Sequence, residues 1–479
     1  MKKTMIRLSV ALLALLLALP MAVACQTKTN EGASDEATTP VDTTPATPWK
    51  DVLLERASEY NEDYTTLRLM TIDGEFNYNA ESISGEDKAQ YKRDMTLYET
   101  YGFDIEISHF PMGSEYATIN NMKTMGGEIP HILIGASAAI MSVAIEGSLQ
   151  NLNDINTLDF ESGYWVDSYV NNCAWDGKIY CTPTYSSRLF YHGPMAIMYN
   201  TTIANQLQLP NLYDLVDGGN WTLEKLAEYA ALGHTVDGST GETNGYGLCA
   251  LKGNGLLLGL YGAIGGTYST MDDEGNIDVD FSGTDANAKL KKIADLVHSE
   301  YTHLEDWKDD VSSFSSGKDL FWYTTTGNFF DGKITGNENL KYGVLPLPKL
   351  DAQQSNYITT VNATSNFFTC AIKNWQGKDL SFVGYIMELY NYLSWDILRP
   401  AKFDTLMKYQ VAQSGNDLRM MELIFDTLYY DHNMVYNFGN TLYDLGWAIA
   451  DNNTENFTST FGEKYRSKIA EDIQKYLGL

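Results

Sequence analysis

Basic residues are scarce in this 479-residue sequence. It has 33 lysines and arginines against 62 aspartates and glutamates, which gives a formal net charge of −29. Nucleic acids and phosphate-rich ligands attract proteins through clustered positive charge. The balance therefore argues against a nucleic-acid partner, and a solvated acidic surface is sufficient to explain it.

Cysteine is also rare, with five residues in all. The sequence has no C-x-x-C pair, and His298 and His303, five residues apart, do not share a helical face. We therefore predict no metal site and no cofactor. Cys173 and Cys181 flank a hairpin turn at residues 176–177, and a two-residue turn directs them to opposite sides of the ribbon. Free thiols are favoured, although a longer loop or a bulge would permit a bridge.

Long apolar runs are absent except for residues 8–19, close to the start of the chain. Lys2, Lys3 and Arg7 precede this run, and the small residues 22–24 lead to Cys25. The run is too short to span a bilayer, and the pattern is typical of a signal peptide over residues 1–24. Ordinary signal peptidase also accepts the small residues 22–24, but the polar stretch that follows favours lipidation of Cys25.

Residues 26–48 are rich in Thr, Pro, Asp and Glu, contain no aromatic residue, and have Val41 as their only large aliphatic side chain. Such a composition cannot bury enough apolar surface to fold. We expect residues 25–50 to be a lipidated, disordered linker. The protein is then anchored to the outer face of the cell membrane and contacts the membrane only through its lipid.

The remainder of the chain alternates between strand and helix patterns. Residues 67–73, 103–110 and 131–137 are apolar or alternating strand segments, and two helical patterns separate them. This order predicts an α/β fold with a mostly parallel sheet flanked by helices. Ligands bind such sheets beyond the carboxyl ends of their strands, here residues 73–74, 110–111 and 135–137.

Several later segments resemble one known family. They are "GSLQNLNDI", "WDGKIYCTPT" running into "MAIMYN", "NWTLEKLAEYA", "FSSGKDLF", "YGVLPLPKLDAQQSNYIT" and "MMELIFDTLYYDHNMVYNFG". Their order and spacing are similar to those of the extracellular solute-binding proteins of family 1, the maltose-binding-like receptors of ABC importers. The resemblance extends from about residue 67 to the end of the chain.

The resemblance implies a monomer with two α/β lobes and a hinge between them. The N-terminal lobe is expected at residues 64–184 plus 358–398, and the C-terminal lobe at 190–355 plus 400–479. The chain is expected to cross between the lobes at residues 182–191, at 357–362 and near Pro400. The additional segment 186–194 departs from the simplest family pattern and leaves open which of its residues line the cleft.

A sugar receptor needs an aromatic plane and a rim of polar side chains. The expected ligand-binding residues are Asp73, Ser137, Tyr185, Trp322, Tyr323, Thr324, Tyr436 and Asn437. The alternatives are that Trp322 and Tyr323 pack in the core of their lobe and that Asp73 only forms a turn with Gly74. Because neighbouring strand residues face opposite ways, we expect Phe321 in the core and Trp322 in the cleft.

The predicted function is that of a receptor which binds a small-molecule carbohydrate, most simply an oligosaccharide, and delivers it to ABC transporter permease subunits. A receptor for a peptide or another polar solute is the alternative. A secreted polysaccharide-degrading enzyme would need two suitably spaced carboxylates. No G-x-S-x-G, H-E-x-x-H or Walker pattern supports an enzyme, and "GASAA" around Ser137 lacks the second glycine of a nucleophile elbow.

Overall fold

The computed structural model describes residues 49–479 except 77, 79–80, 82–84, 112, 126–127, 138–139, 141–142, 145–146, 175–176, 254–255, 307–312, 331–333, 335–336, 338, 363–365, 404–413 and 478–479. Residues Lys50–Leu479 form one compact unit. The predicted signal peptide, the lipidation of Cys25 and nearly all of the linker lie outside the described residues. Among the helices that are described, none has the length and apolar character needed to cross a membrane.

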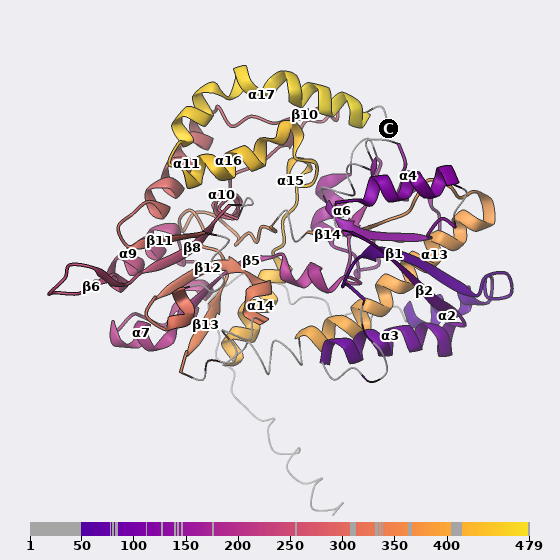
Figure 1. Cartoon of the computed structure of the whole chain (residues 1–479), viewed down its shortest axis with the longest axis horizontal. Coiled ribbons are helices and arrows are strands. Elements are labelled where there is room, and N and C mark those ends of the chain that lie inside the picture. The colour runs from indigo at the N-terminus through magenta and orange to yellow at the C-terminus, as the bar shows by residue number, and fades with distance from the viewer. Residues whose placement is uncertain are drawn as a thin grey trace, which may run out of the picture. The chain divides into compact units, whose positions relative to one another are not determined.

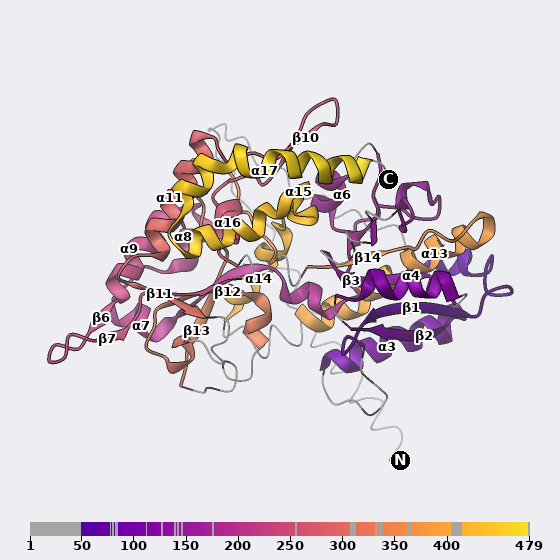
Figure 2. The same cartoon turned by 45° about the horizontal axis from the view of Figure 1, so that its top comes forward.

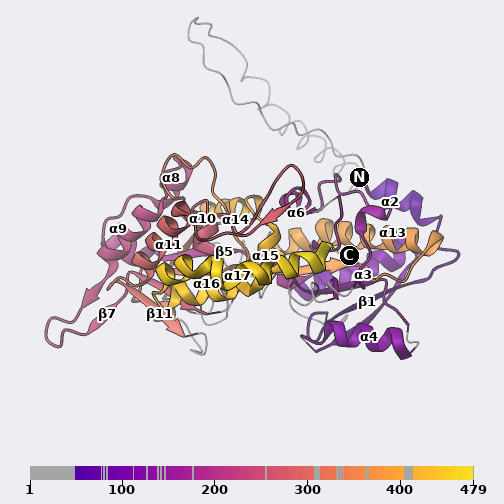
Figure 3. The same cartoon turned by 90° about the horizontal axis from the view of Figure 1, so that it is seen from above.

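The first sheet has the strand order β2-β1-β3-β14-β4. Its strands are β1 (Thr66–Ile72), β2 (Asp104–Phe110), β3 (Ile132–Ala136), β4 (Thr182–Pro183) and β14 (Phe367–Cys370). β1 is parallel to β2 and β3, whereas β14 is antiparallel to β3 and β4. Helix α4 (Glu115–Met125) lies on one face, and α3 (Gly85–Tyr101) and α13 (Gly377–Leu393) lie on the other (Figures 1 and 3).

The second sheet has the order β11-β8-β12-β5-β13. Its strands are β5 (Met195–Asn200), β8 (Leu248–Lys252), β11 (Thr302–Asp306), β12 (Phe321–Thr325) and β13 (Tyr342–Leu345). β8 is parallel to β11 and β12, and β5 is antiparallel to β12 and β13. The α/β class and the mostly parallel sheets are confirmed, since four of the five strands in each sheet run in the same direction. The exceptions are β14 in the first sheet and β5 in the second, which are antiparallel to both of their neighbours and enter from the other sheet.

Local signals in the sequence explain several helix ends. α3 ends at Tyr101 because Gly102 follows with a φ of +86°, a conformation that suits glycine. α9 (Leu223–Gly233) begins after Thr222, whose hydroxyl accepts a hydrogen bond from the Lys225 N–H at 3.3 Å, as the N-cap pattern predicts.

The last two helices pack against a helix from the middle of the chain. α16 (Thr441–Ala450) and α17 (Thr454–Leu477) pack against α11 (Thr284–Val297), as Figure 2 shows. The face of α11 that carries Leu290, Ile293 and Val297 is buried, as the helical spacing of these apolar residues requires.

The chain passes between the two sheets three times. It leaves the first sheet after β4 for β5 and returns from β13 to β14. After α13, which packs on α3, the chain reaches α14 (Gly415–Asp426), which packs on β13. The residue ranges assigned to the two lobes stay a prediction.

The four described cysteines are free and buried, which confirms the preference for free thiols: Cys173, Cys181, Cys249 and Cys370. Cys181 Sγ lies 3.3 Å from the hydroxyl of Tyr169. Burial raises the pKa of both the Cys181 and the Cys173 thiols, so neither has the thiolate character of a reactive cysteine. Asp176, in the predicted hairpin turn, lies outside the described residues.

Candidate functional site

Three backbone segments between the sheets are hydrogen-bonded side by side. The Met195 N–H donates to the Thr360 carbonyl, and the Asn362 N–H donates to the Gly193 carbonyl, both at 2.9 Å. On the other side of the middle segment, the Thr359 N–H donates to the Thr427 carbonyl at 2.8 Å. The first and second passages and the segment after α14 therefore form a narrow ribbon. Side chains that border this ribbon are candidates for a site shared by both sheets.

The carboxyl end of β1 is joined to the first passage through a buried carboxylate. Glu75 accepts hydrogen bonds from the Ser187 hydroxyl at 2.8 Å and from the Arg188 N–H at 2.7 Å. The Arg188 guanidinium donates to Glu75 Oε2 at 3.4 Å and to the Gly74 carbonyl at 2.7 Å. Burial raises the pKa of Glu75, while the hydrogen bond from Ser187 and the charge of Arg188 act in the opposite direction.

A second buried charge lies behind this carboxylate. Arg93 on α3 donates to Asp94 Oδ1 at 2.9 Å and to the Ser394 hydroxyl and Ser186 carbonyl at 3.3 Å each. Its guanidinium also lies over the ring of Tyr390, 4.3 Å from the centroid. Ser186 belongs to the first passage and Ser394 follows α13, so this arginine fixes both segments to α3. The site is thus supported by a rigid polar network.

The carboxyl end of β12 reaches the same passage from the second sheet. The Thr326 N–H donates to the Pro194 carbonyl at 2.8 Å, and its hydroxyl donates to the Tyr191 carbonyl at 2.7 Å. Asn328, half-buried, donates to the Thr324 hydroxyl at 2.7 Å. The strand ends of both sheets therefore meet the segment 186–194, whose ligand-lining residues the sequence left open.

Half-exposed polar groups border this meeting point. The Arg188 side chain is 38% exposed and keeps donor capacity toward solvent. Burial, together with the charges of Lys402 and Arg188, lowers the pKa of His192 to about 3, so its ring is neutral at physiological pH. A neutral imidazole carries one donor and one acceptor, and the half-exposed guanidinium of Arg188 belongs to the same passage.

The predicted residues of the first sheet differ in their accessibility. Asp73 is exposed, and its N–H donates to the Phe110 carbonyl at 3.0 Å. Ser137 is buried, and its N–H donates to the Asn366 carbonyl at 2.8 Å. Tyr185, at the start of the first passage, is half-buried and packs edge-on against Phe190. Asp73 and Tyr185 are therefore the two whose side chains reach solvent.

The predicted residues of β12 are largely covered. Trp322 is 7% exposed and stacks on Phe314 with ring centroids 5.8 Å apart, while Phe321 on the opposite face packs against Trp221. The Tyr323 hydroxyl donates to the Leu256 carbonyl. Opposite orientation of Phe321 and Trp322 is thus observed, but both faces of the strand are packed. The assignment of Trp322, Tyr323 and Thr324 to the ligand stays a prediction.

Tyr436 and Asn437 lie at the end of α15 (His432–Tyr436), beyond the third segment of the ribbon. Tyr436 is half-buried and stacks on Phe438 with ring centroids 5.5 Å apart. Asn437 has a φ of +49° and accepts a hydrogen bond from the Leu442 N–H at 3.0 Å, so it caps a helix as well as being accessible. An edge-on contact between Tyr169 and Tyr430, at 5.6 Å, joins this region to the first sheet.

Sequence reasoning missed the buried residues Glu75, Arg93 and Asp94 and the half-exposed Arg188 that pairs with Glu75. Glu75 could have been considered from the sequence, because it directly follows Asp73 and Gly74 at the carboxyl end of the first strand, where ligands bind such sheets. Its partner Arg188 is 113 residues away, and only the folded chain brings the two together.

Comparison with solved structures identifies the class of this fold. The chain is similar to the cyclic α-maltosyl-1,6-maltose binding protein of Arthrobacter globiformis, with 14% identity, a TM-score of 0.57, and 85% of this chain and 98% of that chain covered. A cyclo/maltodextrin-binding protein complexed with maltotetraose matches with 14% identity, a TM-score of 0.54 and 87% and 97% coverage. UgpB of Mycobacterium tuberculosis, in complex with glycerophosphocholine, matches with 15% identity, a TM-score of 0.54 and 87% and 98% coverage.

These similarities show that the chain has the two-lobed fold of solute-binding proteins, which confirms the resemblance at the level of the fold. The matched proteins are binding proteins rather than enzymes. No protein-family model matches the sequence, and the search of curated proteins gave no match.

Proposed function

We propose that this protein is the extracellular receptor of an ABC importer and binds a carbohydrate, most simply an oligosaccharide, between its two lobes. The observation that carries the proposal is the shared fold, which covers 85% or more of this chain in proteins described as binding cyclic α-maltosyl-1,6-maltose or maltotetraose. The proposal includes no catalysis, because a receptor that delivers a sugar to a transporter must release the sugar chemically unchanged.

The ligand is proposed to contact the strand ends and the first passage. Asp73, Tyr185, Tyr436 and Asn437 reach solvent and are the stronger members of the predicted set. Arg188 is added, because its guanidinium is anchored by Glu75 and Gly74 but remains 38% exposed. A sugar offers hydroxyl groups to the polar side chains and C–H faces to the tyrosine rings, so both kinds of residue are needed.

The ribbon of three hydrogen-bonded segments is proposed to act as the hinge. A ligand that contacts both lobes stabilises the closed arrangement, because only differential contacts shift such an equilibrium. Small-angle scattering should therefore give a smaller radius of gyration when a bound ligand is present. An unchanged radius with a ligand that demonstrably binds would contradict hinge closure.

The receptor is proposed to be a monomer that is anchored to the outer face of the membrane by a lipid on Cys25. Residues 26–50 form the linker between this anchor and the folded part. This arrangement keeps it near the permease subunits that accept the ligand. A flexible linker of about two dozen residues spans on the order of 25 Å, which is enough to separate the folded part from the membrane surface.

A different polar solute is the second candidate, because the Mycobacterium tuberculosis protein of the same fold was solved with glycerophosphocholine. A peptide is a further member of this alternative. The acidic charge of the chain, −29 overall, weighs against a phosphate ligand unless a local cation such as Arg188 compensates.

Isothermal titration calorimetry against malto-oligosaccharides, other glycans, short peptides and glycerophosphodiesters tests the proposal. We expect at least one glycan to bind without appearance of shorter products in chromatography of the mixture. Release of product would instead indicate an enzyme, and binding confined to peptides or phosphodiesters would indicate the second candidate.

Arg188→Gln tests the place of the site. It keeps hydrogen-bond donors but removes the charge, and we expect a loss of affinity of about tenfold or more. Arg419→Gln is the matched control, since Arg419 is also half-exposed, at 43%, and pairs with Asp217 away from the ribbon. Equal affinity in the two variants, both shown to be folded by circular dichroism, would exclude Arg188 from the site.

A further inference from the structure

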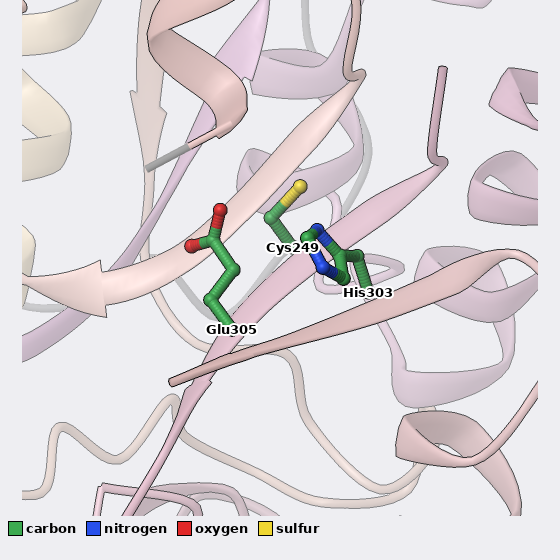
Figure 4. A group of neighbouring side chains, drawn as sticks. All are labelled: Cys249, His303 and Glu305. Carbon is green, nitrogen blue, oxygen red and sulfur yellow. The ribbon is translucent and has the colours of Figure 1, made fainter. Parts of the chain in front are cut away.

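Three side chains with metal-ligating atoms lie together on the second sheet. Cys249 belongs to β8, and His303 and Glu305 belong to β11 (Figure 4). The Cys249 Sγ, a ring nitrogen of His303 and a carboxylate oxygen of Glu305 all lie within 4.8 Å of one another. Thiolate, imidazole and carboxylate are the three ligand types that zinc takes in proteins.

Strand register produces this cluster. Cys249 and His303 are direct neighbours in the parallel ladder of β8 and β11. Glu305 is two residues beyond His303, so its side chain lies on the same face of the sheet. Cys249 is 54 positions before His303 in the sequence, which is why no ligand spacing was visible there.

Ser313 lies in the middle of the cluster. Its N–H donates to Glu305 Oε1, and its hydroxyl is 3.1 Å from Cys249 Sγ and 3.4 Å from His303 Nδ1. The serine hydroxyl thus contacts two of the three ligand atoms and occupies the space between them. A cation that entered this space would replace the hydroxyl with a partner of much higher affinity for sulfur and nitrogen.

Asp319 provides a fourth ligand atom next to the sulfur. Its Oδ2 accepts the hydrogen bond of the Cys249 thiol at 3.2 Å, and its Oδ1 accepts one from the Tyr246 N–H at 2.7 Å. Ligand atoms around tetrahedral zinc are about 3.3–3.6 Å apart, given bonds of about 2.0–2.3 Å. The sulfur–oxygen pair already has nearly this separation. The ligand atoms of Cys249, His303 and Glu305, within 4.8 Å of one another, need to approach by about 1 Å, and Asp319, which lies outside that group of three, has to move toward it.

We propose that Cys249, His303 and Glu305, with Asp319 as the fourth ligand, form a zinc site in the second sheet. Cys249, Glu305 and Asp319 are buried, at 0%, 3% and 2% exposed, and a divalent cation would offset the two carboxylates and the thiolate. Binding transfers the thiol proton to the solvent and forms the Zn–S bond. The ion would join β8, β11 and the short segment that leads into β12, so it stabilises the fold and is independent of the proposed solute binding.

The first test measures zinc directly. Metal-free full-length protein is incubated with zinc chloride, unbound zinc is removed on a desalting column, and the bound metal is determined by mass spectrometry. We expect about one tightly held zinc per chain and a higher melting temperature. An equal concentration of calcium or magnesium should not displace it, because both prefer oxygen ligands. Wild-type protein that retains no zinc would overturn the proposal.

Variants locate the bound ion. Cys249→Ser and His303→Gln should lose the zinc and the gain in melting temperature. Cys370→Ser, a buried thiol in the first sheet, and His298→Gln, whose ring contacts the Ile449 carbonyl at 2.8 Å, are the matched controls and should keep both. Ser313→Ala removes the competing hydroxyl but no ligand, so it should bind zinc at least as well as the wild type.

Cobalt gives an independent readout. The sulfur-to-cobalt absorption band should appear in wild-type protein and in Cys370→Ser but not in Cys249→Ser. If Cys249→Ser fails to fold, the half-buried His303→Gln decides, with circular dichroism as the check on folding. Zinc retained equally by all variants would show binding to the acidic surface instead, and would overturn the proposed site.

Discussion

Replacing Trp322 tests whether its side chain packs in the core of the protein or stacks on a bound sugar. The side chain is 93% covered, stacks on Phe314 and lies beside Cys249 in the strand register. Deletion of a buried tryptophan typically costs about 3–5 kcal/mol, from lost apolar burial and the cavity that remains. We therefore expect Trp322→Ala to lower the free energy of unfolding of the ligand-free protein by about this amount.

The indole N–H refines the prediction. No residue in the described part of the chain accepts a hydrogen bond from the buried Trp322 Nε1, so Trp322→Phe should lose no hydrogen bond and remove a desolvated donor. Trp221 offers a matched control, since it is 0% exposed and its Nε1 donates to the Pro346 carbonyl at 3.0 Å. Trp221→Phe leaves that carbonyl unpaired, and an unsatisfied buried group costs about 1–3 kcal/mol. Trp221→Phe should therefore be the more destabilising of the two by about that difference.

Urea unfolding followed by circular dichroism gives these free energies, in the absence and presence of a bound ligand. Ligand at about 100 times its Kd should stabilise the wild type by about 2.7 kcal/mol. If Trp322→Ala leaves the ligand-free protein as stable as the wild type but abolishes this gain, Trp322 is a ligand platform. The argument from burial would then be refuted.

Three further predictions concern packing, pH and location. Gly247→Ala should prevent stable folding, because a Cβ there would meet the Ala230 carbonyl oxygen at 1.7 Å, whereas Gly238→Ala, which has open space, should be close to neutral in thermal unfolding. Burial raises the pKa of Glu388 to about 7, so the native state holds its proton more tightly than the unfolded state and stability should fall between pH 4.5 and 7, by up to about 3 kcal/mol; a Glu388→Gln protein with the same decline in urea titrations would contradict this. Cys25→Ser should release the protein from the membrane fraction, and wild-type protein found mainly in the soluble fraction would exclude lipid anchoring.

Much of the fold follows from short stretches of sequence. The end of α3 at Gly102 and the start of α9 after Thr222 are set by backbone conformation and capping within a few residues. The alternation of strand and helix patterns over residues 67–137 likewise gives β1, β2 and β3 in parallel. Free thiols at Cys173 and Cys181 could be predicted from the geometry of a short turn.

Other features depended on contacts between distant parts of the chain. The mixed order of the sheets arises because β5 and β14 come from the opposite sheet, and no local pattern records that exchange. Period-two alternation correctly separated Phe321 from Trp322, but whether the second face is covered depends on Phe314 and the segment that carries it.

The candidate sites likewise depend partly on local sequence and partly on long-range contacts. The sequence by itself indicated the class of fold and the strand ends where a ligand would bind. The tertiary structure alone paired Glu75 with Arg188 and placed Cys249 beside His303, since register and chain passages are set by long-range packing rather than by local conformational preference.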